Sequence, residues 1–136
     1  FELDKKEIEP GEVVLEVRDL ECTNDKGLPA LRGVNLNVRH GEIVGLAGVA
    51  GNGQRELAEV ITGLRKCCTG KIFLHGKDVT NKEPRDSILQ GISHVPEDRT
   101  HVGSAPNLSL TDNMIMIQPS MRSGVAWLLY LPNSLP

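Results

Sequence analysis

Residues 45–64, GLAGVAGNGQRELAEVITGL, decide the fold of this chain. A glycine-rich loop here runs directly into an amphipathic segment, which predicts a loop followed by a helix. Four apolar residues recur at the spacing of one helical face: Leu57, Val60, Ile61, Leu64. The run before the loop, residues 43–47, is apolar almost throughout and predicts a strand buried on both faces. A strand, a glycine-rich loop and a helix in this order are typical of a phosphate-binding site.

The loop has the glycines of a phosphate-binding loop but lacks its side chains. Gly48, Gly51 and Gly53 allow the backbone to curl so that its N–H groups face phosphate oxygens. Gln54 and Arg55 stand where such a loop has a Lys and a Ser or Thr. Gln has no charge, and a guanidinium has no lone pair for Mg²⁺. The loop is therefore either a weak nucleotide site without efficient hydrolysis or a glycine-rich turn without a ligand.

The composition is that of a globular domain. The chain has 136 residues, 39% of them apolar and 24% charged. Its net charge of −3 and its 3% aromatic content argue against a nucleic-acid-binding surface. No apolar run is long enough to span a membrane, and the acidic N-terminus does not resemble a signal peptide. The three cysteines and four histidines lack the spacing of a metal site, so we expect free thiols.

The rest of the sequence predicts short strands and two further helices. Alternating apolar residues predict strands over 13–18, 34–39 and 69–74, with turns at 24–27 and 76–78. Downstream we expect a helix over 84–90, a strand over 92–95, a loop over 96–107, and a helix starting near Leu110 with Ser109 or Thr111 as N-cap. The predicted fold class is α/β, with a mixed sheet that is antiparallel at its N-terminal part and contains the strand over 43–47 as a parallel member.

Several collinear stretches of the chain resemble one known family. They are VLEVRDL, GLPALRGVNLNVRHGEIVGLAGVAGNGQRELAEVITGL, TGKIFLHGKDVT, PRDSILQGISHVPEDR and LSLTDNM. Together, over roughly residues 13–117, they resemble an ATP-binding cassette (ABC) ATPase domain. GNGQRELAE, PEDR and LSLTDNM are most similar to the second, degenerate cassette of the double-cassette ATPases that drive sugar or nucleoside importers. The resemblance implies a P-loop NTPase-like core.

The resemblance also implies roles for individual residues. Gly48 to Arg55 occupy the Walker A position, and Glu97 occupies that of the Q-loop glutamine, which senses Mg²⁺ and the γ-phosphate. Alternatively, Glu97 is a solvated loop residue, and we expect Asp98 and Arg99 to form a local ion pair. Residues 21–27 offer no aromatic side chain for adenine stacking. The predicted nucleotide-binding residues are Gly48, Val49, Ala50, Gly51, Asn52, Gly53, Gln54, Arg55 and Glu97; no catalytic residue or metal ligand is predicted.

The expected organisation has three segments. Residues 1–12 are a linker, 13–117 a partial ABC nucleotide-binding domain, and 118–136 a tail that departs from the family. We expect this tail to be non-native or, alternatively, a divergent helix. The family's signature sequence, Walker B carboxylates and switch histidine do not appear, so we expect a truncated cassette that is inactive alone.

The resemblance implies ATP as the cofactor, with Mg²⁺ held weakly if at all. The implied partners are a second nucleotide-binding domain and transmembrane permease subunits, at the cytoplasmic face of the membrane. Exposed sheet edges predict self-association. The alternative function is a scaffold that docks on the permease through residues 90–105 without binding nucleotide. A third, an unrelated P-loop enzyme such as a small kinase, would need the missing Lys.

Overall fold

The computed structural model describes residues 9–49 and 51–116 of the chain. They divide into two compact units between Ser87 and Ile88, and each unit is described by itself. The elements are β1 (Val13–Thr23), β2 (Pro29–Arg39), α1 (Gln54–Ile61), β3 (Thr69–Leu74), β4 (Lys77–Asp78), α2 (Pro84–Leu89) and α3 (Leu110–Ile115).

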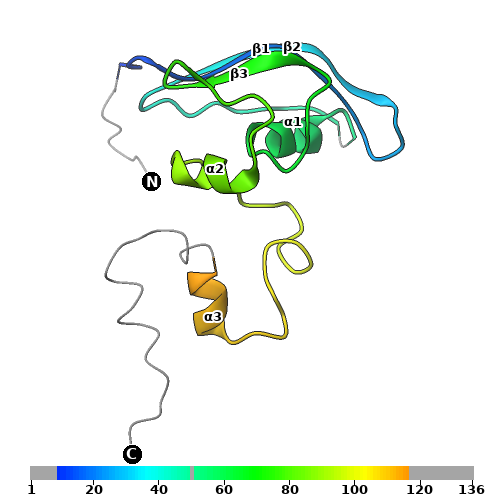
Figure 1. Cartoon of the computed structure of the whole chain (residues 1–136), viewed down its shortest axis with the longest axis vertical. Helices are drawn as coiled ribbons and strands as arrows, with labels where there is room; N and C mark the ends of the chain where they lie inside the picture. Colours follow the sequence, from blue (N-terminus) through cyan, green and yellow to red (C-terminus); the bar gives the residue numbers. More distant parts are fainter. Residues whose placement is uncertain (1–8, 50, 117–136) are drawn as a thin grey trace, which may run out of the picture. The chain divides into compact units, whose positions relative to one another are not determined.

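An antiparallel sheet in the order β2-β1-β3-β4 forms one layer of the first unit (Figure 1). β1 and β2 pair from Val13↔Arg39 to Thr23↔Pro29, with register shifts along the way. At one shift Asp19 adopts a φ of 46°, and Asn35 bonds to it from the neighbouring strand through two hydrogen bonds of 3.0 Å. The alternation expected for 13–18, 34–39 and 69–74 is therefore confirmed, and the first two strands extend beyond it.

Two tight turns connect the strands. In the β1–β2 turn, the Asn24 side-chain oxygen accepts hydrogen bonds from the N–H groups of Lys26 and Leu28, each at 3.0 Å. In the β3–β4 turn, His75 and Gly76 both have positive φ, 48° and 73°, as a two-residue type I′ hairpin requires. The turn predicted at 76–78 thus begins one residue earlier, because β4 already includes Lys77.

Helix α1 packs against one face of the sheet (Figure 1). Its Leu57 and Val60 are buried, as are Leu20 and Ile72 of the sheet. The helix ends at Ile61 with Thr62 as its C-cap, and Gly63 follows at a φ of 80°, the left-handed conformation that is common after a helix end. Leu64, predicted to lie on the buried stripe, is instead 55% exposed because the helix ends before it.

The prediction of a strand over residues 43–47 is wrong. Residues 43–49 adopt no strand, and Ile43 is 98% exposed. An apolar run becomes a buried strand only if neighbouring strands accept its hydrogen bonds on both sides. In the described residues β1 pairs with β2 and β3, and β3 with β4, so none of these pairings includes 43–47. The strand predicted over 92–95 is likewise absent, and Val95 is 82% exposed.

The second unit contains a long loop and the short helix α3. Ser109 is the N-cap of α3, which settles the choice between Ser109 and Thr111. Its Oγ accepts a hydrogen bond from the Asp112 N–H at 3.1 Å and donates one to the Asp112 carboxylate at 2.7 Å. Asn113 donates to and accepts from the backbone of Ala105, at 3.0 and 2.7 Å, and so fixes the loop before the helix.

Candidate functional site

The glycine-rich loop ends in close contact with β2. Gly51 and Gly53 have φ values of 89° and 95°, a region that favours glycine. A Cβ on Gly53 would lie 2.6 Å from the carbonyl oxygen of Ala30 and 2.9 Å from a methyl group of Leu31. A Cβ on Gly51 would meet nothing within 4 Å. Gly53 is therefore required both for backbone conformation and for space, and Gly51 for conformation alone.

The start of α1 has no side-chain cap. Gly53 is the N-cap, and it makes no side-chain hydrogen bond to the helix. The first N–H groups of any helix lack partners within the helix, and here no capping side chain satisfies them. They lie at the positive end of the helix dipole, directly after the glycine-rich loop. This arrangement is suited to an anion such as phosphate.

Gln54 lies against the beginning of the loop. A Cβ on Gly48 would collide with the amide nitrogen Nε2 of Gln54, so the Gln54 side chain folds back over Gly48. Gln54 is half-buried, whereas Val49, the residue that follows Gly48 in the sequence, is exposed. One hydrogen bond closes a turn within the loop: the Asn52 N–H donates to the Val49 carbonyl at 3.3 Å. The Gln54 amide is thus an uncharged hydrogen-bond donor at the position where a phosphate-binding loop has a lysine ammonium.

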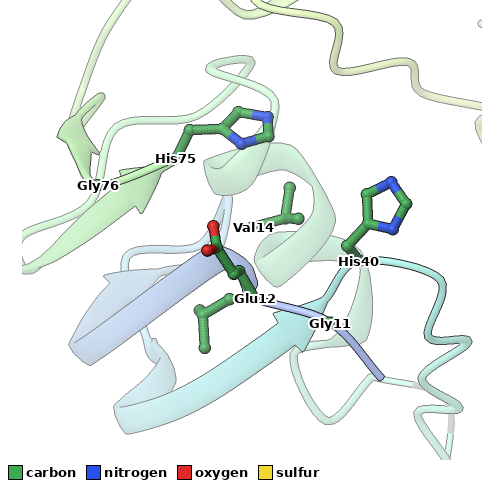
Figure 2. A pocket seen from close by; sticks show the side chains of 7 residues that line it. Gly11, Glu12, Val14, His40, His75 and Gly76 are labelled. Atoms are coloured by element: carbon green, nitrogen blue, oxygen red, sulfur yellow. The ribbon is translucent and has the colours of Figure 1, made fainter. Parts of the chain in front are cut away.

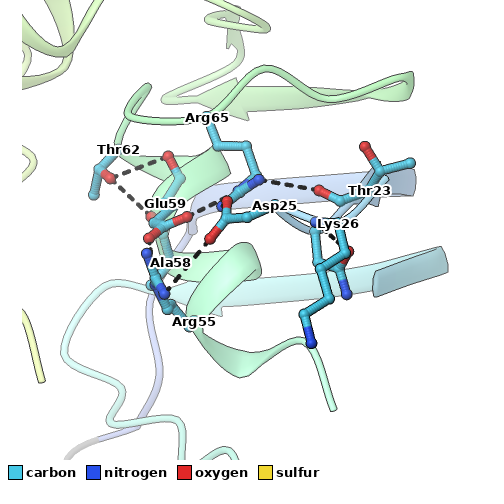
Figure 3. A network of polar contacts seen from close by, with 9 residues as sticks. Thr23, Asp25, Lys26, Arg55, Ala58, Glu59, Thr62 and Arg65 are labelled. Atoms are coloured by element: carbon cyan, nitrogen blue, oxygen red, sulfur yellow. Dashed lines mark hydrogen bonds and ion pairs between the residues drawn. The ribbon is translucent and has the colours of Figure 1, made fainter. Parts of the chain in front are cut away.

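Arg55 is directed away from the loop. Its Nε donates to a carboxylate oxygen of Glu59 at 2.7 Å, and its Nη1 lies 3.8 Å from the carboxylate of Asp25. Glu59 is one turn farther along α1, so the guanidinium extends away from the helix start. Figure 3 shows the carboxylates of Asp25 and Glu59 between two guanidinium groups, those of Arg55 and Arg65.

Arg65 completes a ring of four charged side chains, Arg55, Glu59, Arg65 and Asp25, which we call the charged ring. Arg65 donates to Glu59 at 2.8 Å, to Asp25 at 2.5 Å and to the Thr23 carbonyl at 3.1 Å. It therefore ties the β1–β2 turn to α1 and to the segment after it. Arg65 and Glu59 are largely buried, with side chains 17% and 16% exposed, whereas Arg55 and Asp25 are 64% and 66% exposed.

The contacts in the charged ring shift the pKa values of Asp25, Arg55 and Arg65. The hydrogen bond from Arg65 lowers the pKa of Asp25 below its ordinary value, and the hydrogen bond to Asp25 raises the pKa of Arg65. The hydrogen bond to Glu59 raises the pKa of Arg55. Asp25, Glu59 and Arg65 were not predicted as site residues from the sequence. The spacing of Arg55 and Glu59, four residues apart on a helix, was a usable signal for one of these contacts.

Two predicted site residues are not among those described above. Ala50 is outside the described residues. Glu97 is exposed in the loop of the second unit. The ion pair predicted between Asp98 and Arg99 is wrong: the Asp98 carboxylate accepts a hydrogen bond from the His101 N–H at 2.9 Å and lies 3.0 Å from the His101 ring. The loop turns back at this point, so His101 faces Asp98 and Arg99 does not.

A pocket lies at the end of the sheet. Its volume is about 560 Å³, and Figure 2 shows Glu12, His40 and His75 around it. It shares no lining residue with the glycine-rich loop. Within the described part of the chain, no three His, Cys, Asp or Glu side chains are grouped so that they could hold a metal ion. Cys22, Cys67 and Cys68 are free, as expected. No helix among the described residues has the length and apolar content that crossing a membrane requires.

Comparisons with known proteins identify the family. A family model described as ABC transporter matches residues 31–130, and the chain belongs to this family. It is 51% identical over 116 residues to the glucose import ATP-binding protein TsgD13 of Haloferax volcanii, a match that covers 85% of this chain and 21% of the relative. It is 44% identical over 116 residues to the nucleoside import ATP-binding protein NupA of Lactococcus lactis subsp. cremoris, covering 85% and 23%. The chain thus spans little more than a fifth of the length of these relatives.

Solved structures confirm the fold. The ADP conformation of MJ1267, an ATP-binding cassette of an ABC transporter, matches with a TM-score of 0.63 and 26% identity, covering 92% of this chain and 48% of that one. A nucleotide-free ATP-binding cassette from an ABC transporter matches with a TM-score of 0.58 and 23% identity, covering 84% and 49%. The predicted α/β ABC ATPase fold and the resemblance to import ATP-binding proteins are both confirmed.

Proposed function

We propose that this chain is the nucleotide-holding part of an ATP-binding subunit of an importer for sugars or nucleosides. The names of the relatives support the transport class, since they are glucose and nucleoside import ATP-binding proteins. The observation that supports binding is the uncapped start of α1 behind Gly51 and Gly53. Its N–H groups and dipole belong to the backbone, so they do not depend on the missing Lys.

The same loop does not fit a catalytic Mg²⁺ site. Magnesium prefers oxygen ligands, and a P-loop supplies one from a Ser or Thr hydroxyl. Here that position is Arg55, which donates to Glu59 and has no lone pair to offer. Glu97 is the one other predicted contact; its role as the Q-loop residue stays part of the proposal. We propose a degenerate Walker A, as in the second cassette of a double-cassette ATPase, that binds ATP without hydrolysing it in this chain alone.

Calorimetric titration with MgATP tests this proposal. The natural chain is titrated beside the double variant Gln54→Lys, Arg55→Thr, which restores a charged and a hydroxyl side chain. We expect the natural chain to bind at micromolar to submillimolar strength, and the variant to bind more tightly. Binding by the variant alone would contradict the proposal and favour the scaffold function described next.

One observation favours the second candidate, a non-catalytic scaffold that docks on permease subunits. The second unit exposes several large apolar side chains: Val95 82%, Val102 67%, Leu110 78%, Met114 75%. Leu110 and Met114 lie four residues apart and therefore on one side of α3. Exposed apolar residues of this density mark interaction surfaces. In this case the partners are a second nucleotide-binding domain and the permease, at the cytoplasmic face of the membrane, whether or not nucleotide binds.

We also propose that the isolated chain self-associates. Ile43, Leu46 and Val49 are 98%, 58% and 75% exposed in a segment that lacks strand partners. Apolar segments with free backbone groups pair readily with other chains. Size-exclusion chromatography with light scattering over a concentration series should show a mass that rises with concentration. The variant Ile43→Lys, Leu46→Lys should remain monomeric, and a natural chain that is monomeric throughout would exclude this proposal.

A further inference from the structure

We infer that Glu59 and Asp25 limit the affinity of the glycine-rich loop for polyphosphate by holding the Arg55 guanidinium away from it. The inference rests on the proposed nucleotide-binding function and adds the residues that set its strength. Arg55 is the second residue of α1, immediately after the loop. Its guanidinium nevertheless bonds to Glu59, one turn farther from the helix start, at 2.7 Å.

The two carboxylates, and not packing, fix the direction of Arg55. Its side chain is 64% exposed. Exposed ion pairs contribute little to stability, so turning this side chain requires little free energy. The Asp25 contact, at 3.8 Å, is weaker than the Glu59 contact. Glu59 is therefore the main restraint on Arg55 and Asp25 the lesser one.

Release of Arg55 would not leave the carboxylates unpaired. Arg65 donates to Glu59 at 2.8 Å and to Asp25 at 2.5 Å, and it retains both contacts when Arg55 turns away. The link between the β1–β2 turn and α1 would therefore persist. A guanidinium has a planar fork of N–H donors that matches two phosphate oxygens, which makes a released Arg55 a fitting ligand for an anion at the loop.

Titration with inorganic triphosphate, in Mg²⁺-free buffer at low salt, tests the inference. We expect Glu59→Gln to bind about fivefold more tightly than the natural chain and Asp25→Asn about twofold more tightly, because each weakens the hold of an exposed ion pair on a charge-assisted donor. Combining either variant with Arg55→Ala should remove the gain. Glu16→Gln is the matched control, because it removes the same charge from another arginine-paired glutamate, one bonded to Arg18 at 2.8 Å. It should leave the affinity unchanged.

The outcomes separate this inference from the proposed function. A gain that depends on Arg55 supports the inference even if the natural chain binds too weakly to measure, which would count against the proposed function alone. Equal affinities in all variants, or a gain that persists with Arg55→Ala, would overturn the inference while leaving any ATP binding by the natural chain intact. Absence of triphosphate binding in every variant overturns it too. Circular dichroism checks that each variant is folded. If Glu59→Gln is unfolded, the triphosphate affinity of the exposed Asp25→Asn variant decides whether the inference holds.

Discussion

The starts of α1 and α3 show two ways in which a helix can begin. At α3, the Ser109 hydroxyl accepts a hydrogen bond from the Asp112 N–H and donates one to the Asp112 carboxylate, so a side chain of the same protein caps one of the first N–H groups. At α1, Gly53 contributes no side chain, and the N–H groups remain without a capping partner. The cap at α3 stabilises a short helix. The open start of α1 gives up that stabilisation and leaves a positive helix end beside a glycine-rich loop, where it can receive an anion.

The comparison predicts that a cap cannot simply be transferred to α1. Gly53→Ala should destabilise the fold by about 3 kcal/mol, because it combines a left-handed backbone with a clash against Ala30. Gly51→Ala, at a similar φ but in open space, should cost about 1 kcal/mol. Urea denaturation of both variants measures the difference. Equal effects would show that the contact with β2 is unimportant and that conformation alone selects glycine.

The closed start of α3 depends on the loop before it. Asn113→Ala removes the hydrogen bonds between its side chain and the backbone of Ala105. It should therefore lower the free energy of local opening of this loop by about 2 kcal/mol. Hydrogen exchange at the Ala105 amide should then be roughly 30-fold faster. Asn107→Ala, an exposed residue of the same loop, is the control. A change of similar size in both variants would mean that Asn113 does not anchor the loop.

The cap itself should have a smaller effect. Ser109→Ala should reduce the stability of α3 by about 1 kcal/mol, since the Asp112 N–H loses its acceptor. Exchange at the Asp112 amide, followed by NMR, should be about fivefold faster. Thr111→Ala, exposed in the first turn, should leave it unchanged. If Ser109→Gly and Ser109→Ala exchange at the natural rate, the two helix starts do not differ in the way proposed here.

Acid should act on the α1 side and have the smallest effect of the four. The pKa of Asp25 lies below its ordinary value of 3.8, mainly through the hydrogen bond from Arg65. Its contribution to stability is therefore complete above about pH 4 and is lost as the pH falls below that value through the lowered pKa. Urea midpoints of the natural chain and Asp25→Asn should differ at pH 5 and converge as the pH falls through the lowered pKa of Asp25. A constant difference would exclude Asp25 as the group responsible.

The sequence predicted the helix and the strands where their residues follow a regular period. The apolar stripe through Leu57 and Val60 predicted α1, and alternating apolar residues predicted β1, β2 and β3. The apolar run at 43–47 was misassigned, because such a run indicates a preference for burial but not which strands will accept its hydrogen bonds. The presence of a loop glycine at Gly53 could be predicted, but not its contact with Ala30, which depends on how β2 packs.

The direction of Arg55 shows the same limit at the site. Its pairing with Glu59 follows from helical spacing, whereas the contact with Asp25 depends on the β1–β2 turn approaching α1. That approach is set by Arg65, which joins Asp25, Glu59 and the Thr23 carbonyl. Sequence periodicity describes one element at a time, whereas the four members of the charged ring come from three segments: α1, the segment after it and the β1–β2 turn.

The long β1–β2 hairpin has a consequence for the order of folding. Its strands are joined by only residues 24–28, so they can pair after closing a short loop, whereas β3 must return across α1 to reach β1. The hairpin, with Asp25 at its tip, should therefore form early, and Arg55 and Arg65 should meet it late. Substitutions in the charged ring should then speed unfolding while leaving the folding rate nearly unchanged, as expected for contacts made after the transition state.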